Sequence, residues 1–190
     1  MIEASWLTIS VNIGFLGVFK YYNFFLDSFA DLISNFGFQV HYYTLNIILP
    51  VGISFYTFHG LSYVIDIYKR RIEPERNFVE YALFVSYFPL LVAGPIERAT
   101  HLLPQIKRKR NFSYEKAIQG VKQIIWGLFK KVVIADNCAF FVNQIFDNSA
   151  NYSAPELWLG SILFAFQIYG DFSGYSDIAL GTSKLFGMDL

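Results

Sequence analysis

The sequence predicts an all-α fold, a multi-pass membrane helical bundle with kinked or re-entrant and interfacial helices. Three observations lead to this prediction. Of the 190 residues, 54% are hydrophobic and only 16% are charged, against about 25% in a typical soluble domain. Aromatic residues reach 19%, which suits a bilayer because Tyr and Trp gather at the headgroup level. Long apolar runs also recur along the chain.

Charge and cysteine content narrow the possible functions. The 15 basic and 15 acidic residues cancel, so bulk charge gives no reason to expect a nucleic-acid partner. The single cysteine, Cys138, excludes an internal disulfide. No two of the three histidines have the spacing of metal ligands, so we expect no metal site. We also expect no bound cofactor. The start of the chain, MIEASWLTIS, lacks the basic region of a cleavable signal peptide.

The first apolar run predicts a membrane helix. Residues 4–19 carry no charge, and with the aromatic residues up to Phe25 the run reaches the roughly 20 residues that span a bilayer. Lys20 and Asp27 are expected near its end, where long side chains extend to the interface. Gly37 marks a break in the mixed segment that follows.

The second and third runs contain helix breakers. Pro50 and Gly52 interrupt residues 42–68 and predict a kinked or interrupted helix. Residues 78–96 contain two further prolines and a glycine, and basic segments flank them on both sides. The positive-inside rule places both flanks in the cytoplasm. The 78–96 segment is therefore predicted to be a re-entrant hairpin, unless one flank breaks the rule.

Residues 113–134 have the periodicity of an amphipathic helix. The apolar positions are Ile118, Val121, Ile124, Ile125, Leu128, Val132 and Val133, and the opposite side carries Lys116, Gln119, Gln123 and Lys130. Two interpretations remain open. The helix lies in the interface plane with its lysines toward lipid headgroups, or it packs on the rest of the protein. The basic run 107–110 nearby is interpreted as an anchor to anionic lipid.

The last helix is predicted to begin near Pro155. Ser153 and Glu156 have the spacing of a capping box, and Pro155 lies in the favoured first turn. This helix continues through an apolar run into the segment AFQIYGDFSGYSDIALGTSKLFG at residues 165–187. Within that segment Gly170 and Gly174 form a G-x-x-x-G step, which lets another helix approach closely.

The same segment holds the main candidate site residues. A carboxylate at bilayer depth is unfavourable by roughly 2.5–3.5 kcal/mol and is rarely found there without a partner or a task. Helical spacing places Ser173 and Asp177 on one face and Asp171 and Tyr175 on another. These four residues are interpreted as cavity-lining. They line a substrate channel, bind a cation, cap a broken helix or form a structural polar network.

His59 is the fifth candidate for lining the cavity. It lies in the middle of the second apolar run and has the chemistry of a general base. The favoured interpretation is nevertheless a packing histidine. His41 and His101 are expected to be structural.

Four blocks of the sequence, in order, resemble the membrane-bound O-acyltransferase family, and in particular its alginate O-acetyltransferase branch. They are KYYNFF at 20–25, LPVGISFYTFHGLSYVIDIYKR at 49–70, FPLLVAGPIERATHLLPQ at 88–105 and FQIYGDFSGYSDIALGTSKLFG at 166–187. The resemblance implies that residues 1–190 are a partial domain of this family. The family's first helices and its C-terminal catalytic block, with the catalytic histidine, are expected outside this chain. No catalytic residue is therefore assigned here, and the piece alone is expected to be inactive.

The resemblance also implies a reaction and a location. An acyl group, such as acetyl, arrives as a thioester such as acetyl-CoA and is transferred to a hydroxyl. The acceptor is an extracellular polysaccharide, a cell-wall polymer or a partner protein that carries the acyl group. The enzyme is expected in the bacterial inner membrane, in contact with lipid and without nucleic acid. Two rival interpretations are a transporter or channel element with an ion or proton site at Asp171 and Asp177, and a non-catalytic membrane scaffold.

Overall fold

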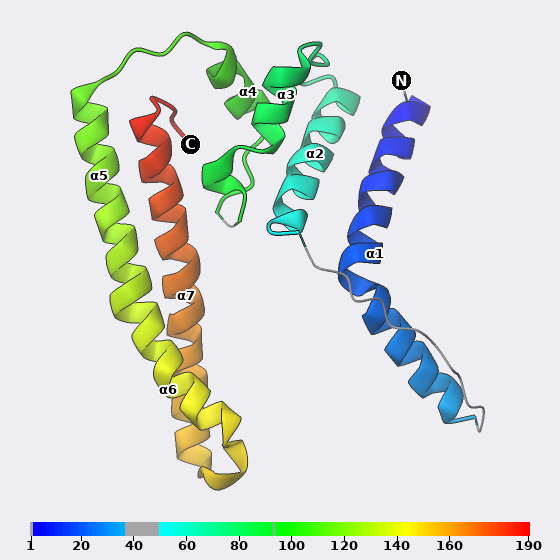
Figure 1. Cartoon of the computed structure of the whole chain (residues 1–190), viewed down its shortest axis with the longest axis vertical. Helices are drawn as coiled ribbons and strands as arrows, with labels where there is room; N and C mark the ends of the chain where they lie inside the picture. The colour runs from blue at the N-terminus through cyan, green and yellow to red at the C-terminus, as the bar shows by residue number, and fades with distance from the viewer. Residues whose placement is uncertain (1, 37–49, 93) are drawn as a thin grey trace. The chain divides into compact units, whose positions relative to one another are not determined.

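The computed structural model describes residues 2–36, 50–92 and 94–190, and every regular element in these ranges is helical (Figure 1). The chain divides into two compact units. The first comprises Met1–Ser86 with Arg98–Leu103, and the second comprises Tyr87–Glu97 with Pro104–Leu190. Within the described residues, no helix combines the length and the apolarity needed to cross a membrane.

The first unit begins with the helix predicted from the first apolar run. Helix α1 (Ile2–Ser34) is longer than predicted, so Lys20 and Asp27 lie within it rather than at its end. The Nζ of Lys20 donates a hydrogen bond to the Oγ of Ser54 at 3.4 Å, which joins α1 to the next helix. The predicted break at Gly37 lies outside the described residues.

Helix α2 (Ile53–Tyr68) begins directly after the predicted interruption. Gly52, directly before this helix, has a φ of 76°, in the left-handed region that favours glycine. Residues 42–49 of the same run lie outside the described residues, as does His41. Helix α3 (Phe78–Val85) follows and is capped by Asn77, whose side chain accepts a hydrogen bond from the Val79 N–H at 3.0 Å.

An aromatic cluster holds α2 against α3. Phe84 is completely buried, and its ring lies 5.9 Å from that of His59 and 6.1 Å from that of Tyr63. The Tyr63 hydroxyl accepts a hydrogen bond from the Glu75 N–H at 2.7 Å, which fixes the loop before α3. This core supports the packing interpretation of His59.

The third apolar run is interrupted, as its prolines predicted. Helix α3 ends at Val85, and a short 3₁₀ helix, η1 (Phe88–Leu90), follows in the second unit. Whether this segment re-enters a bilayer stays a prediction. Helix α4 (Ala99–Lys107) comes next, with the unit boundary inside it and Pro104 in its last turns.

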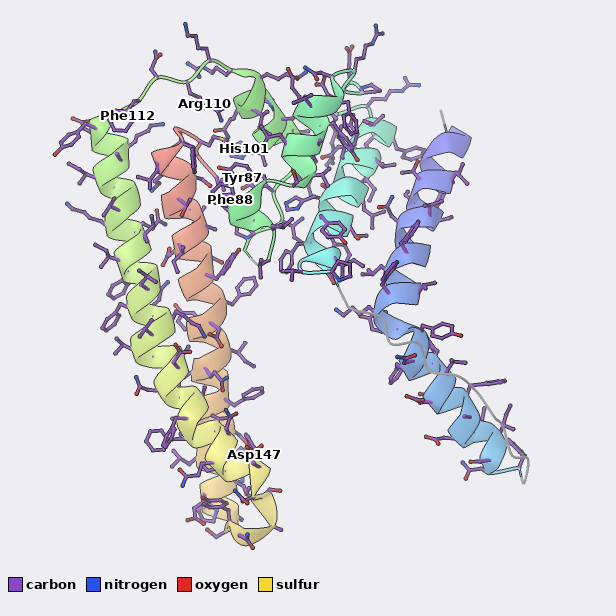
Figure 2. All side chains as sticks on the ribbon, viewed as in Figure 1. Tyr87, Phe88, His101, Arg110, Phe112 and Asp147 are labelled. Atoms are coloured by element: carbon purple, nitrogen blue, oxygen red, sulfur yellow. The ribbon has the colours of Figure 1, made fainter. Side chains whose placement is uncertain are left out.

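The second unit is built on a long helical hairpin (Figure 1). Helix α5 (Tyr114–Leu128), the π-helical segment η2 (Phe129–Ala135) and helix α6 (Asp136–Asp147) follow one another without a break. The helix predicted over 113–134 is thus confirmed, but it continues to Asp147. Figure 2 shows Phe112 and Asp147 at opposite ends of this arm.

The return arm is helix α7 (Ala154–Leu185), which follows the short 3₁₀ helix η3 (Ser149–Asn151). The predicted capping box is confirmed, since the Glu156 carboxylate accepts hydrogen bonds from the Ser153 N–H at 2.7 Å and the Ser153 hydroxyl at 2.6 Å. These hydrogen bonds lower the pKa of Glu156. At the other end of α7, the Tyr87 hydroxyl donates to the buried Ser183 Oγ at 3.1 Å and joins the η1 segment to the hairpin (Figure 2).

Candidate functional site in the helical hairpin

Glycines bring the two arms of the hairpin into backbone contact. A Cβ on Gly127 would lie 2.5 Å from the carbonyl oxygen of Gly174, and one on Gly181 would lie 2.5 Å from that of Gly120. No side chain fits between these backbones, so α5 and α7 approach as closely as small-residue helix pairs allow. The G-x-x-x-G step at Gly170 and Gly174 therefore has the role predicted for it.

The π-helical segment lies against two glycines of α7. Gly174 faces Gly127 and Lys131, and Gly170, four residues earlier on α7, faces Lys130 and Ala135. A Cβ on Gly170 would be 3.1 Å from the Lys130 oxygen and 3.2 Å from the Ala135 nitrogen, two atoms with the five-residue spacing of a π-helical hydrogen bond. Single π turns occur frequently at functional sites. Lys130 and Lys131 both lie in this segment, and both side chains contact α7.

Lys130 is the centre of a partly buried polar cluster between the arms. Its Nζ donates to the Ser173 Oγ at 2.5 Å and forms an ion pair with Asp177. Asp177 also accepts a hydrogen bond from the Gln123 amide at 3.1 Å, and Lys184 donates to the same amide's oxygen at 2.9 Å. The Lys130 side chain is 10% exposed and that of Asp177 is 20% exposed. These five residues, Gln123, Lys130, Ser173, Asp177 and Lys184, form the inner cluster.

Lys131, the next residue, has a different environment. Its Nζ contacts carboxylate oxygens of Asp136 at 2.7 Å and Asp171 at 2.6 Å, and the Lys131 and Asp171 side chains are 43% and 39% exposed. Both residues line a cavity of about 410 Å³, the outer pocket. The other lining residues are Ile168, Phe172, Tyr175 and Ile178. An apolar and aromatic wall with an ammonium and a carboxylate at its edge suits a ligand that carries hydroxyl groups, because the two charged groups donate and accept hydrogen bonds.

The candidate residues thus separate into two sites. Ser173 and Asp177 both bind Lys130, whereas Asp171 and Tyr175 both line the outer pocket. Asp171 and Asp177 bind different lysines, so the geometry gives no support to a single ion site made by the two carboxylates. His59 lies in the first unit and is described there.

The interface-plane interpretation of residues 113–134 is wrong for Lys130 and Gln123. Both side chains bind α7 rather than projecting toward lipid headgroups. The apolar positions are the exposed ones, with Val121, Ile125, Leu128, Val132 and Val133 all more than a third accessible. The second interpretation, packing on the rest of the protein, is correct, but the packing face is the glycine and polar face. The physical reason is the ion pair, which satisfies a buried lysine only where a carboxylate faces it.

Sequence reasoning missed the lysines of this site. Lys130 was assigned to a polar face and Lys131 received no role. The signal that identifies them is the spacing of the glycines, since Gly120 and Gly127 are seven residues apart and so are Gly174 and Gly181. This matched spacing, on two helices that run antiparallel, identifies the contact faces and places the lysines near the acidic residues of α7.

Comparison with known proteins identifies the family. Residues 71–190 match the family model described as MBOAT, membrane-bound O-acyltransferase family. The chain is 38% identical to the peptidoglycan O-acetyltransferase of Helicobacter pylori, over 97% of this chain and 40% of that protein. It is 40% identical to the "probable alginate O-acetylase AlgI" of Pseudomonas aeruginosa, over 95% of this chain and 34% of that protein.

A more distant relative is the teichoic acid D-alanyltransferase of Bacillus subtilis, at 23% identity over 79% of this chain and 38% of that protein. The chain therefore spans at most about two fifths of the length of these curated relatives. The family model nevertheless covers well over half of the chain, including the whole hairpin with its inner cluster and outer pocket. The chain belongs to the membrane-bound O-acyltransferase family.

Proposed function

We propose that this chain is part of an integral membrane O-acyltransferase that transfers an acyl group, acetyl in the first instance, to hydroxyls of an extracellular polysaccharide or cell-wall polymer. The observation that carries this proposal is the 38–40% identity, over nearly the whole chain, to proteins named as a peptidoglycan O-acetyltransferase and an alginate O-acetylase. The donor is an acyl thioester such as acetyl-CoA. The acceptor is the polymer itself or a partner protein that carries the acyl group to it.

The arrangement of the hairpin supports a location within the bilayer of a bacterial inner membrane, as part of a multi-pass bundle. Charged groups lie between the arms, and apolar side chains project outward from α5 and α7. This is the pattern expected when lipid tails surround a helix pair, because a charge in lipid must face a partner in the protein interior.

The outer pocket is the part of this chain that we assign to the substrate. During transfer the thioester C–S bond breaks, the new C–O bond forms, and the hydroxyl proton leaves for the thiolate. Asp171 at the pocket edge accepts a hydrogen bond from a hydroxyl group of the acceptor, and the ring of Tyr175 packs on its apolar surface. Asp171 is a binding residue in this proposal. The general base for the hydroxyl is not assigned within the chain.

The proposal is tested in a bacterial strain that lacks its own polymer O-acetylase. The intact reading frame is expressed there, and ester-linked acetate on the wall polymer and on exported polysaccharide is released by mild alkali and quantified. We expect the amount of ester-linked acetate to increase on either the wall polymer or the exported polysaccharide. No increase on either, from a protein that is present in the membrane, would contradict acetyl transfer.

The assignment of the outer pocket is tested in the same strain with Asp171→Asn. We expect about 10- to 100-fold less ester-linked acetate, since a displaced substrate loses rate on this scale. The matched control is Asp147→Asn, an exposed carboxylate at the far end of α6 (Figure 2). If Asp171→Asn and Asp147→Asn both retained full transfer, the substrate assignment would be wrong while the acyltransferase proposal would stand.

A further inference from the structure

A second, separate pocket lies where α5 begins and α7 ends, within the second unit. Its volume is about 250 Å³, and polar side chains line most of it. The lining residues, which we call the basic pocket, are Gln105, Arg108, Lys109, Arg110, Asn111, Lys116, Gly187 and Asp189. Four of them are cationic and one is a carboxylate. At about 30 Å³ per water molecule, the space accommodates a ligand group of several heavy atoms.

The end of α7 builds one wall of this pocket. The Gly187 N–H donates to the Lys184 oxygen and the Met188 N–H donates to the Ser183 oxygen, both at 3.0 Å, which is the hydrogen-bond pattern of a Schellman motif. Gly187 has a φ of 73°, so the chain reverses there and Asp189 turns back toward α4. A Cβ on Gly187 would lie 3.7 Å from the Cβ of Arg110, so the basic segment packs directly on this turn.

Asp189 is held in place mainly through its backbone. The Gln105 amide donates to the Asp189 carbonyl at 2.7 Å, and the Asp189 N–H donates to the Gln105 Oε1 at 2.9 Å. The Asp189 carboxylate is then free to pair with the Lys116 Nζ at 2.6 Å. The one acid of the pocket therefore neutralises the one lysine that comes from α5.

The remaining three cations make the pocket strongly positive. Arg108, Lys109 and Arg110 are exposed, and within the described part of the chain none of them forms an ion pair with a carboxylate. By contrast, Lys130 and Lys131 each face an aspartate. Arginine presents a planar fork of N–H groups that matches two phosphate oxygens at once. The Asn111 amide and the nearby start of α5 add donors and a favourable helix dipole.

We propose that the basic pocket binds a phosphoryl group. Two sources carry this chemistry, namely the headgroup of an anionic phospholipid and the phosphates of a soluble ligand. The proposal does not rest on the outer pocket or the inner cluster, because the basic pocket shares no residue with either.

The test uses the intact protein that contains this chain, purified in a neutral detergent. Inorganic pyrophosphate binding is measured by calorimetry. Phosphatidylglycerol retention, relative to phosphatidylcholine, is measured by native mass spectrometry. The variant is Arg108→Gln with Arg110→Gln, and the control, which removes the same charge elsewhere, is Lys69→Gln with Lys122→Gln. We expect the pocket variant to bind one of the two probes about 10-fold more weakly than the unmodified protein does, because it loses charge-assisted hydrogen bonds. The control variant should bind that probe as tightly as the unmodified protein.

The probe that weakens identifies the source of the phosphoryl group. The proposal is overturned if the unmodified protein binds neither probe, or if the pocket variant and the control weaken binding equally. Asp189→Asn is a second test variant. It keeps the hydrogen bonds to Gln105, since these use the Asp189 backbone. It releases Lys116 and is expected to bind the same probe more tightly by about two- to threefold. Weaker binding by Asp189→Asn, with an unchanged melting temperature, would also contradict the proposal.

Discussion

Lys130 and Lys131 are neighbours in the sequence, yet they occupy two different kinds of site. Lys130 lies in the inner cluster at 10% exposure, with Ser173 and Asp177 as partners. Lys131 lies at the edge of the outer pocket at 43% exposure and pairs with two exposed aspartates. Both lysines lie in η2 and contact α7, one in the interior of the hairpin and one at its edge. We infer that the inner ion pair maintains the structure, whereas the outer pair is accessible to a ligand.

The largest expected effect comes from removing the inner lysine. Lys130→Met leaves the Asp177 carboxylate, whose side chain is 20% exposed, without its cation. Loss of one partner from a fully buried pair is unfavourable by about 3–5 kcal/mol, and we expect an effect near the lower end of that range here. Lys131→Met is the control on the adjacent residue, and loss of an exposed pair changes stability by only about 0–1 kcal/mol. Both are measured by unfolding the intact protein in mixed micelles. Equal losses in the two variants would remove the distinction between inner and outer sites.

A smaller effect is expected at the glycine contacts. Gly174→Ala places a Cβ 2.8 Å from the Gly127 oxygen, so the arms must separate, and overpacking of this kind costs about 1–3 kcal/mol. Gly14→Ala on α1 is the matched control, because its Cβ meets nothing within 4 Å. The control should be neutral or stabilising by up to about 1 kcal/mol, as expected for alanine in a helix interior. A neutral Gly174→Ala would show that the arms are not in backbone contact.

The smallest effect concerns the start of α7 and depends on pH. The Glu156 pKa is lowered in the folded protein by its hydrogen bonds to Ser153, so its carboxylate stabilises the fold above the ordinary glutamate pKa of 4.5. That contribution is lost as the pH falls through the lowered pKa. Glu156→Gln should therefore melt slightly below the unmodified protein at pH 7, and the difference should shrink at acid pH. A difference that widened on acidification would have the wrong sign for this cap.

Local signals in the sequence predicted most of the helices. The capping box at Ser153 and Glu156 located the start of α7, and the prolines and glycine of residues 78–96 predicted the interruption there. Helical spacing separated Ser173 and Asp177 from Asp171 and Tyr175, and these pairs do have different partners. In each case the determining residues lie within a few positions of one another.

The partners across the hairpin were not predicted, because they depend on residues far apart in the chain. Lys130 contacts Ser173, 43 positions away, so no local pattern marks the pair. The apolar periodicity of residues 113–134 left two interpretations open and did not identify the glycine and polar face as the contact. In the hairpin, glycines and paired charges form the contact between the arms, and apolar side chains face outward. The π turn has no local sequence signal that we recognise.

The central claim is that the two arms of the hairpin are held together by a charged contact between Lys130 in η2 and Asp177 in α7. A double-mutant cycle with Lys130→Met and Asp177→Leu tests it most directly, in the intact protein unfolded in mixed micelles. Residues in one buried ion pair couple by about 0.5–3 kcal/mol, and we expect the upper half of that range, with the double variant more stable than either single variant. Independent, additive losses would contradict the account.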